Sequence, residues 1–474
     1  MKVEEFIKRM KKSFHSSEDL VCHVFSVSGV KACAVFIDGF IDRVELEKHV
    51  IEPLVKAEEY QFDETSLLST LTASLPPEKE KSIKKITEKV ASGSTAVTFD
   101  IGDEIYLFST RKTPERAVSE PPTSAVIKGP REGFNENCRT NLLLIRRALA
   151  TPDLVVKTIN VGRRSLTSVS VVYVQGIARA GLVQDILKKI KSIDIDGVID
   201  SSYIARFLEA RPYSLFKQTG TSEKPDVVAS KLLEGRVGIV VDGSPIVLTL
   251  PFVMMEDFLA EDDYYKRPIR ATFLRTARLL ALFFALFLPA TLVALEEYQF
   301  QMIPLKLLTT ILNSAKGIPF TPVVEMLIAL VLFEILNEAS VRMPRYVGMA
   351  MSVVGAIILG ETAVKAGILS SVAVLVTALS AIGLYAIPDE VGTFSTLRIL
   401  YVVVAGTLGL FGLVLAGVAT TAYLVTLEVY GTPYLAPVAP VVYHDMEDAF
   451  FKKSLVGMKY RPRIFKPEDR RRQK

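Results

Sequence analysis

Two long runs without a charged side chain constrain this sequence more than any other feature. No Asp, Glu, Lys or Arg occurs from Leu279 to Ala294 or from Ser370 to Ile387, whereas charges occur in nearly every block of ten residues up to about Arg270. A helix needs roughly 18 or more apolar residues to cross a hydrocarbon core of about 30 Å. Buried helices of soluble proteins are usually shorter, so these runs predict an integral membrane protein.

Hydropathy divides the predicted membrane part into five candidate segments, and this odd number conflicts with the expected sidedness. Both flanks are rich in Lys and Arg, which the positive-inside rule places in the cytoplasm. Two cytoplasmic ends require an even number of crossings, so either the charged segment 323–336 lies at the interface or the last segment doubles back. The five segments are Phe273–Leu295, Val323–Leu336, Tyr346–Thr362, Leu369–Ile387 and Leu397–Leu427.

The last candidate segment has an unusual length. It contains 31 residues from Leu397 to Leu427, too many for one upright helix and too few for two full spans. A tilted helix, a bent helix and a helical hairpin are all compatible with it.

The basic flanks indicate a membrane surface as their partner. Four Arg residues between 267 and 278 accompany the start of the first apolar run, and ten Lys or Arg residues follow Ala449. No nucleic-acid motif accompanies them, so attraction to anionic lipid headgroups is the simpler interpretation.

The three cysteines, Cys22, Cys33 and Cys138, all precede the apolar runs. An odd number at wide, irregular spacing indicates neither a disulfide framework nor a zinc site, which fits a reducing cytoplasm. Residues 1–14 are charged and lack the apolar core of a signal peptide. We therefore expect the later hydrophobic segments to drive membrane insertion.

Two similar patterns suggest that the first half is duplicated. Residues 32–42 (ACAVFIDGFID) and 170–178 (SVVYVQGIA) each combine an apolar strand with a Gly turn, and a helical pattern follows each. Residues 96–108 and 237–248 are both β-branched runs around an Asp/Gly turn, which is a hairpin signal. Chance similarity of strand-turn-strand patterns is the alternative.

The predicted fold is a duplicated α/β cytoplasmic part followed by a transmembrane α-helical bundle. A segment rich in Pro, Ser, Thr and charge at 112–129 is expected to be an exposed linker. The expected domains are an α/β lobe at 1–125, a second α/β lobe at 126–268, the bundle at 269–430 and a basic cytoplasmic tail at 431–474.

No pattern in the sequence predicts catalysis or a cofactor. The glycine turns lack the spacing of a dinucleotide site or a P-loop, so they are interpreted as turns. The four histidines, at positions 15, 23, 49 and 444, are scattered without metal-ligand or triad spacing. We expect no enzyme activity, no cofactor and no metal.

Ionisable residues within the apolar half are the first group of candidate functional residues, because each is costly in lipid. Glu334 and Glu338 share a helix face, and Glu361 and Lys365 are spaced to pair. These residues and Arg342 are candidates for a pore lining or a subunit contact. The alternative is that they lie at helix ends and extend into the headgroups.

A second group of polar candidates lies early in the second lobe. These residues predict a polar network or interface at the junction of the lobes, although a solvated helix face would show the same alternation of charges. The group comprises Arg131, Glu132, Arg139, Arg146 and Arg147.

Small residues in the apolar segments are a third signal. Gly348, Ser352, Gly355 and Gly360 run through one segment, and four glycines from 406 to 417 run through another. Small residues let transmembrane helices pack closely. This pattern favours a packed, oligomeric bundle, although flexible hinges would look the same.

Several stretches resemble the GerA family of spore germination proteins, in particular its A-type subunit. The most specific is EKPDVVASKLLEGRVGIVVDGSPIVLTLPF at residues 223–252, and the resemblance covers nearly the whole chain in order. The stage V sporulation protein AF shares most motifs, and FIDGFID at residues 36–42 favours the receptor subunit over it. The other stretches are GPREGFNENCRTNLLLIRR at 129–147, IDIDGVID at 193–200, RPYSLF at 211–216, EDDYYKR at 261–267, FEILNEASVRMPR at 333–345 and GTPYLAPVAP at 431–440.

The resemblance implies a subunit of a nutrient germinant receptor in the spore inner membrane, with both termini in the cytoplasm. It further implies a B-type membrane subunit and a C-type lipoprotein as partners, and a homo-oligomer that conducts ions when germination is triggered. A scaffold that conducts nothing is the alternative. A secondary transporter is a weaker one, because the repeat lies outside the membrane part.

Overall fold

The structure is a computed structural model, and it describes residues 2–27, 29–56, 77–100, 104–111, 129–260, 262–344, 347–348, 353–355 and 357–473. Residues 112–128 of the predicted linker at 112–129, the predicted turn at 101–103, Tyr346 and Ser352 lie outside these ranges. The chain forms two compact units. The first contains residues 1–253, 428–432 and 454–474, and the second contains 254–427 and 433–453. The predicted first lobe and residues 126–253 of the predicted second lobe thus belong to one unit, whereas residues 254–268 belong to the other, and the predicted tail is divided between the two.

The first lobe is a five-stranded antiparallel sheet between two layers of helix. Strand β2 alternates Cys33, Val35 and Ile37 on one face with Ala34 and Phe36 on the other, and all five side chains are buried. A strand buried on both faces needs an apolar layer on each side. The strand order is β1(Leu20–Val27), β2(Val30–Ile37), β4(Thr95–Phe99), β5(Ile105–Phe108), β3(Glu78–Glu80).

Helices α1(Val3–Ser13) and α5(Ile83–Ala91) cover one face of this sheet. The other face is covered by a helix that begins at α2(Arg43–Leu46), passes through the π-helical turn η1(Glu47–Ile51) and ends with α3(Glu52–Lys56). Asp42 begins this helix because its carboxylate accepts hydrogen bonds from the backbone N–H groups of residues 44 and 45.

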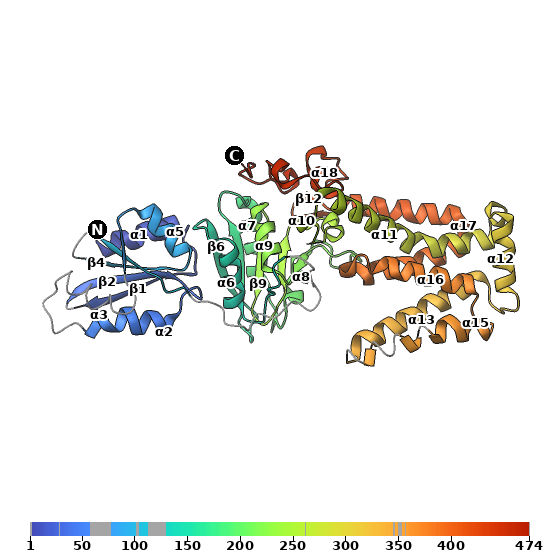
Figure 1. The fold of residues 1–474 in the computed structure, drawn as a ribbon, viewed down its shortest axis with the longest axis horizontal. Coiled ribbons are helices and arrows are strands. Elements are labelled where there is room, and N and C mark those ends of the chain that lie inside the picture. The colour runs from blue at the N-terminus through green and yellow to red at the C-terminus, as the bar shows by residue number, and fades with distance from the viewer. Residues whose placement is uncertain are drawn as a thin grey trace. The chain divides into compact units, whose positions relative to one another are not determined.

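The second lobe is also a five-stranded antiparallel sheet, in the order β6(Leu154–Val161), β7(Thr167–Val174), β9(Val237–Val241), β10(Val247–Leu250), β8(Gly220–Ser222). Val172, Val240 and Leu232 belong to the core between this sheet and helices α6 and α9. The helices of the lobe are α6(Cys138–Ala148), α7(Ala180–Lys191), α8(Ser201–Leu208) and α9(Pro225–Leu233) (Figure 1).

The two sheets have the same topology when the strands are compared in chain order. Among the described residues of each lobe, a helix precedes the first strand, helix lies between the second strand and the third, and another helix precedes the fourth. In each lobe the third strand lies at the edge, next to the fifth. A duplicated segment would give this shared order.

The second unit is helical. Its long helix α11 packs against α16 and α17 (Figure 1). The helix found in the predicted span 369–387 is shorter than expected: α16 contains only 14 residues. The principal helices are α10(Asp262–Tyr265), α11(Pro268–Glu297), α12(Leu305–Ala315), α13(Pro322–Arg342), α15(Ala363–Lys365), α16(Ser371–Leu384), α17(Val391–Val425) and α18(Tyr443–Ala449).

Short elements lie before, between and after these helices. They are the 3-10 turns η3(Met254–Phe258), η4(Phe300–Met302), η6(Pro388–Glu390), η7(Leu455–Gly457) and η8(Arg463–Phe465), the π-helical turn η5(Ile358–Thr362), and the strands β11(Glu428–Val429) and β12(Thr432–Pro433). Of these, η7, η8 and β11 belong to the first unit.

Helix α17 is a helical hairpin that reverses at Gly409. Gly409 has φ 63° and ψ −155°, a conformation that is essentially restricted to glycine. The Tyr401 hydroxyl donates a hydrogen bond to the Thr420 hydroxyl at 2.9 Å across 19 residues, which one straight helix would place about 28 Å apart. Of the three possibilities for the last segment, the structure has the hairpin.

Among the described residues, two helices are long and apolar enough to cross a membrane: Pro268–Glu297 and the continuous stretch Pro388–Val425 that includes η6 and α17. The second of these is the hairpin. Close packing in this unit uses small residues, since a Cβ on Gly406 would lie 2.4 Å from Val323 of α13.

Candidate functional site

A charged cluster lies where α13, α16 and α17 meet in the helical unit. The Arg398 side chain is fully buried, and its Nη2 lies 3.9 Å from Glu334 Oε2. Its Nη1 donates to the Ser380 hydroxyl at 2.9 Å. Ser380 in turn donates to the carbonyl of Ala285 in α11 at 2.6 Å, and Ser395 donates to Glu334 at 2.6 Å. The cluster therefore connects four helices.

Arg398 is incompletely hydrogen-bonded. Its Nε and Nη2 atoms have no hydrogen-bond partner among the described residues. A buried polar group left unsatisfied costs about 1–3 kcal/mol, and a charged group costs more. Buried charges that are incompletely hydrogen-bonded occur more often at functional positions than elsewhere. This cluster is therefore the candidate site of the helical unit.

Two further polar contacts tie α13 to the two ends of α16. Tyr385 donates to the side-chain carbonyl of Asn337 at 2.5 Å. Glu325 is buried, and its carboxylate accepts a hydrogen bond from the backbone N–H of Ser370 at the start of α16 at 2.5 Å. Each of these hydrogen bonds satisfies a polar group that would otherwise be costly among apolar side chains.

The structure separates the five predicted pore or subunit-contact residues. Glu334 belongs to the charged cluster. Glu338 and Arg342 form an exposed ion pair one helical turn apart, and Glu361 and Lys365 form another. Sequence reasoning missed Arg398, although it is the only Lys or Arg between Lys365 and Lys452, and this isolation in an apolar stretch was the available signal.

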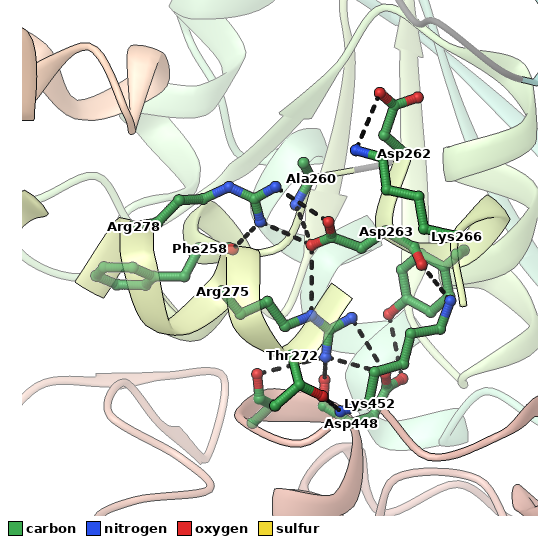
Figure 2. A network of polar contacts seen from close by, with 12 residues as sticks. Phe258, Ala260, Asp262, Asp263, Lys266, Thr272, Arg275, Arg278, Asp448 and Lys452 are labelled. Carbon is green, nitrogen blue, oxygen red and sulfur yellow. Dashed lines mark hydrogen bonds and ion pairs between the residues drawn. The ribbon is translucent and has the colours of Figure 1, made fainter. Parts of the chain in front are cut away.

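A second network lies at the beginning of α11 (Figure 2). Asp263 is fully buried and accepts two hydrogen bonds from Arg278, at 2.7 and 3.0 Å, and one from Arg275 at 3.4 Å. Arg275 also donates to the backbone carbonyl of Asp448 and lies 3.5 Å from its carboxylate. The network thus ties the first apolar helix to the segment that follows the hairpin.

Lys452 closes this network from the C-terminal side. Its ammonium donates to the backbone carbonyl of Asp263, and its backbone N–H donates to the Thr272 hydroxyl at 3.1 Å. Tyr264 donates to the Asp448 carboxylate at 3.1 Å. Sequence analysis identified Asp263 and Tyr264 only as part of the EDDYYKR stretch that resembles the family. It counted Arg275 and Arg278 only among the basic residues that flank the first apolar run.

The pKa of Asp263 is set by two opposing effects. Burial raises the pKa of this carboxyl group, but the hydrogen bonds and charges of Arg278 and Arg275 outweigh burial and hold it below its ordinary value. Burial, together with the charge of Arg275, lowers the pKa of Lys452. The carboxylate is therefore ionised at neutral pH and matched by a cluster of cations.

The lobe-junction group surrounds one buried ion pair. Arg146 in α6 donates to both carboxylate oxygens of Asp19, at 2.9 and 3.0 Å, and both side chains are buried. The Ser17 hydroxyl donates to Asp19 and accepts from the backbone N–H of Val156 in β6. Residues just before β1 are therefore fixed to the start of the second sheet.

The other residues of this group lie nearer the surface. Arg147 pairs with Glu132, and Arg139 lies 3.9 Å from the carboxylate of Asp38 in the first lobe. Arg131 is exposed. Arg139 and Arg146 thus reach the first lobe, whereas Arg147 and Glu132 pair within the second.

Much of the 129–147 motif serves the second lobe itself. Asn141 is fully buried, accepts a hydrogen bond from the backbone N–H of Asn135 and donates to its carbonyl. The N–H of Cys138 donates to the carboxylate of Asp242 in the turn between β9 and β10. Across the described ranges, no group of three or more His, Cys, Asp or Glu residues is arranged to hold a metal ion.

Comparison with known proteins gives matches over the whole chain. Residues 8–464 match the family described as Bacillus/Clostridium GerA spore germination protein. Spore germination protein KA of Bacillus subtilis (strain 168) is 34% identical over 475 residues, which cover 98% of this chain and 87% of that protein. Spore germination protein GerLA of Bacillus cereus is 30% identical over 472 residues, covering 98% of this chain and 96% of that protein.

A sporulation protein and a solved structure are also similar. Stage V sporulation protein AF of Bacillus subtilis (strain 168) is 28% identical over 479 residues, covering 100% of this chain and 96% of that protein. The crystal structure of the N-terminal domain of the A subunit of the Bacillus megaterium spore germinant receptor GerK3 has 26% identity and a TM-score of 0.42, covering 52% of this chain and 94% of that chain.

Proposed function

Because this chain belongs to the Bacillus/Clostridium GerA spore germination protein family, we propose that it is the A-type subunit of a nutrient germinant receptor in the spore inner membrane. Its relatives support a role in spore germination. Identity is higher to spore germination protein KA, at 34%, than to stage V sporulation protein AF, at 28%, which favours a receptor subunit. The role is non-enzymatic, and the partners are a B-type membrane subunit and a C-type lipoprotein.

Several copies of the chain assemble in this proposal, and their helical units form an ion path. The N-terminus and the C-terminus both lie in the cytoplasm. The observation that carries the ion path is the charged cluster around Arg398. A buried Arg held by Ser380 and facing Glu334 across 3.9 Å is costly among apolar helices. A unit that only anchored the chain in lipid would have no use for it.

The cluster holds the resting arrangement of the helices in this proposal. Arg398 links α17 to α16 and to Glu334 of α13, so a relative movement of these helices must break its contacts. Such an element has two discrete arrangements, and a nutrient signal from a partner subunit could bias it toward the open one.

Cation release from proteoliposomes tests this proposal. The full chain is reconstituted with its partner subunits, and leakage of monovalent cations is measured before and after nutrient addition. Arg398→Gln, which removes the link, should raise leakage before nutrient by about tenfold, equivalent to about 1.4 kcal/mol in the opening equilibrium. Thr396→Val, at an exposed site two residues away, should leave leakage unchanged.

The non-conducting scaffold is the second candidate function, favoured by the large apolar surface and the few charges of the helical unit. It predicts no cation release from any of these preparations, with or without nutrient. Equal leakage in wild type, Arg398→Gln and empty liposomes would therefore reject the ion path and retain the scaffold.

A further inference from the structure

The second lobe carries a group of exposed apolar and aromatic side chains on α8 and the loop that follows it. Tyr203 and Phe207 lie one helical turn apart on the outer face of α8 and are 40% and 41% exposed. In the loop, Tyr213 is fully exposed and Leu215 is 44% exposed, and Ile199 just before the helix is 74% exposed. We name these five residues the α8 patch. Neighbouring exposed apolar groups on a folded surface indicate an interaction site.

Hydrogen bonds hold α8 and the loop that carries the α8 patch in place. Asp200 caps α8 by accepting a hydrogen bond from the N–H of Ser202 at 2.9 Å, and the Ser244 hydroxyl donates to Asp200 at 2.5 Å. The loop is fixed by buried Gln218, whose side-chain carbonyl accepts from the N–H groups of residues 210 and 211, both at 3.0 Å. Its amide donates to the carbonyl of Arg211 at 2.8 Å. The exposed aromatic side chains therefore do not result from an unstructured segment.

Two of the segments of this unit that adjoin the apolar helices in the chain contact the end of α8 and its loop. Tyr430, which follows the end of α17, donates to the carbonyl of Leu208, the last residue of α8, at 3.1 Å. Phe252, which precedes α11, lies under the ammonium of Lys217 at 5.2 Å, at the end of the loop. Along the chain, Tyr430 follows Val425, the last residue of α17, by five positions, and Phe252 precedes Pro268, the first residue of α11, by 16 positions.

We propose that the α8 patch inserts into the headgroup region of the lipid bilayer. Tyr and Phe side chains favour this interface because their rings are apolar and Tyr carries a polar hydroxyl. Arg206, between the two aromatic residues on α8, is an exposed cation for anionic headgroups, with its guanidinium 3.4 Å from Glu209. The inference rests on the proposed membrane location of α17.

The absence of Trp from the chain makes the test direct. Single variants Tyr213→Trp and Phe207→Trp of the full chain are reconstituted in phosphatidylcholine–phosphatidylglycerol vesicles, with or without bromine on the acyl chains near the headgroups. Val24→Trp, at a 51% exposed position of β1, is the matched control in the first lobe. Phe411→Trp, at a 71% exposed position of α17, reports on the membrane location itself.

The expected result is loss of Trp emission in brominated vesicles for Tyr213→Trp and Phe207→Trp, and no loss for Val24→Trp. If Phe411→Trp is quenched but neither patch variant is, the α8 patch does not touch lipid, and the inference is overturned while the membrane location stands. A blue-shifted but unquenched patch variant would mean that protein covers the patch. An unquenched Phe411→Trp would overturn the membrane location of α17 and the inference with it.

Discussion

Arg146 and Asp19 form a buried bidentate ion pair between the two lobes although 127 residues separate them in the chain. The pair is built from the side chains of α6 and of the turn before β1. Because Ser17 and Val156 also bind at this point, it is the polar centre of the junction between the lobes.

Arg146→Met should destabilise the first unit strongly. The substitution leaves the Asp19 carboxylate buried without its cation, and breaking a buried pair in this way costs about 3–5 kcal/mol. Thermal unfolding of the detergent-solubilised chain measures the effect. Arg147→Met is the matched control, because the Arg147 pair with Glu132 is partly exposed, and such pairs contribute about 0–1 kcal/mol. Equal melting temperatures for the two variants would contradict the structural role of Arg146.

Gly409→Ala should destabilise the helical unit. Alanine at φ 63° and ψ −155° is strained, at a cost of about 1–3 kcal/mol, and its Cβ would lie 3.0 Å from the Gln299 amide. The measurement is the melting temperature in detergent, compared with Gly392→Ala. Gly392 lies in the same helix with nothing within 4 Å of an added Cβ, so that variant should match or exceed the wild type. A Gly409→Ala variant as stable as the wild type would exclude the reversal at this residue.

Acidification should weaken the network at the start of α11. The pKa of Asp263 is lower in the folded protein than its ordinary value of about 3.9. Its contribution to stability is therefore complete above that ordinary value and is lost as the pH falls through the folded pKa. Melting temperatures of wild type and Asp263→Asn are compared between neutral and strongly acidic pH. The variant should be less stable at neutral pH and should lose less stability on acidification; parallel curves would argue against the pairing.

Cys33 should resist alkylation while the first lobe is folded. Burial, with a smaller effect from neighbouring Cys22, raises the pKa of the Cys33 thiol to about 12. Thiolate is the reactive form, and the Cys33 side chain of β2 is fully buried in the core beneath α1 and α5. Maleimide labelling at mildly alkaline pH, read by peptide mass spectrometry, should therefore modify Cys33 only after denaturation. An introduced cysteine at exposed Val44 of α2 should label in the native state, and comparable labelling of Cys33 there would show that the lobe opens.

Local patterns predicted the elements of the first unit well. The apolar run and Gly39 turn of residues 32–42 correspond to β2 and the turn after it, where Gly39 has φ 77°. The helical pattern after residue 178 corresponds to α7. These features depend on neighbours in the sequence, because side-chain alternation and turn geometry are local.

The charged sites depend on distant partners and could not be read from local pattern. Arg398 meets Glu334 across 64 positions of the chain, and Lys452 meets Asp263 across 189. A single Arg near the start of an apolar run is as compatible with a helix end at the headgroups as with a buried ion pair. Sequence analysis therefore identified Glu334 as a candidate but not its partner Arg398. The paired spacing of Glu361 and Lys365, by contrast, correctly indicated an ion pair within one helix.

Because α17 reverses at Gly409, it does not change the side of the membrane on which the chain continues. Since its two arms are antiparallel and Tyr401 lies against Thr420, residues before Val391 and residues after Val425 emerge into the same aqueous compartment, whatever depth the tip reaches. Epitope tags inserted at these two positions should therefore be digested from the same side of a sealed vesicle, and α17 can be lengthened or shortened at its tip without inverting anything that follows it.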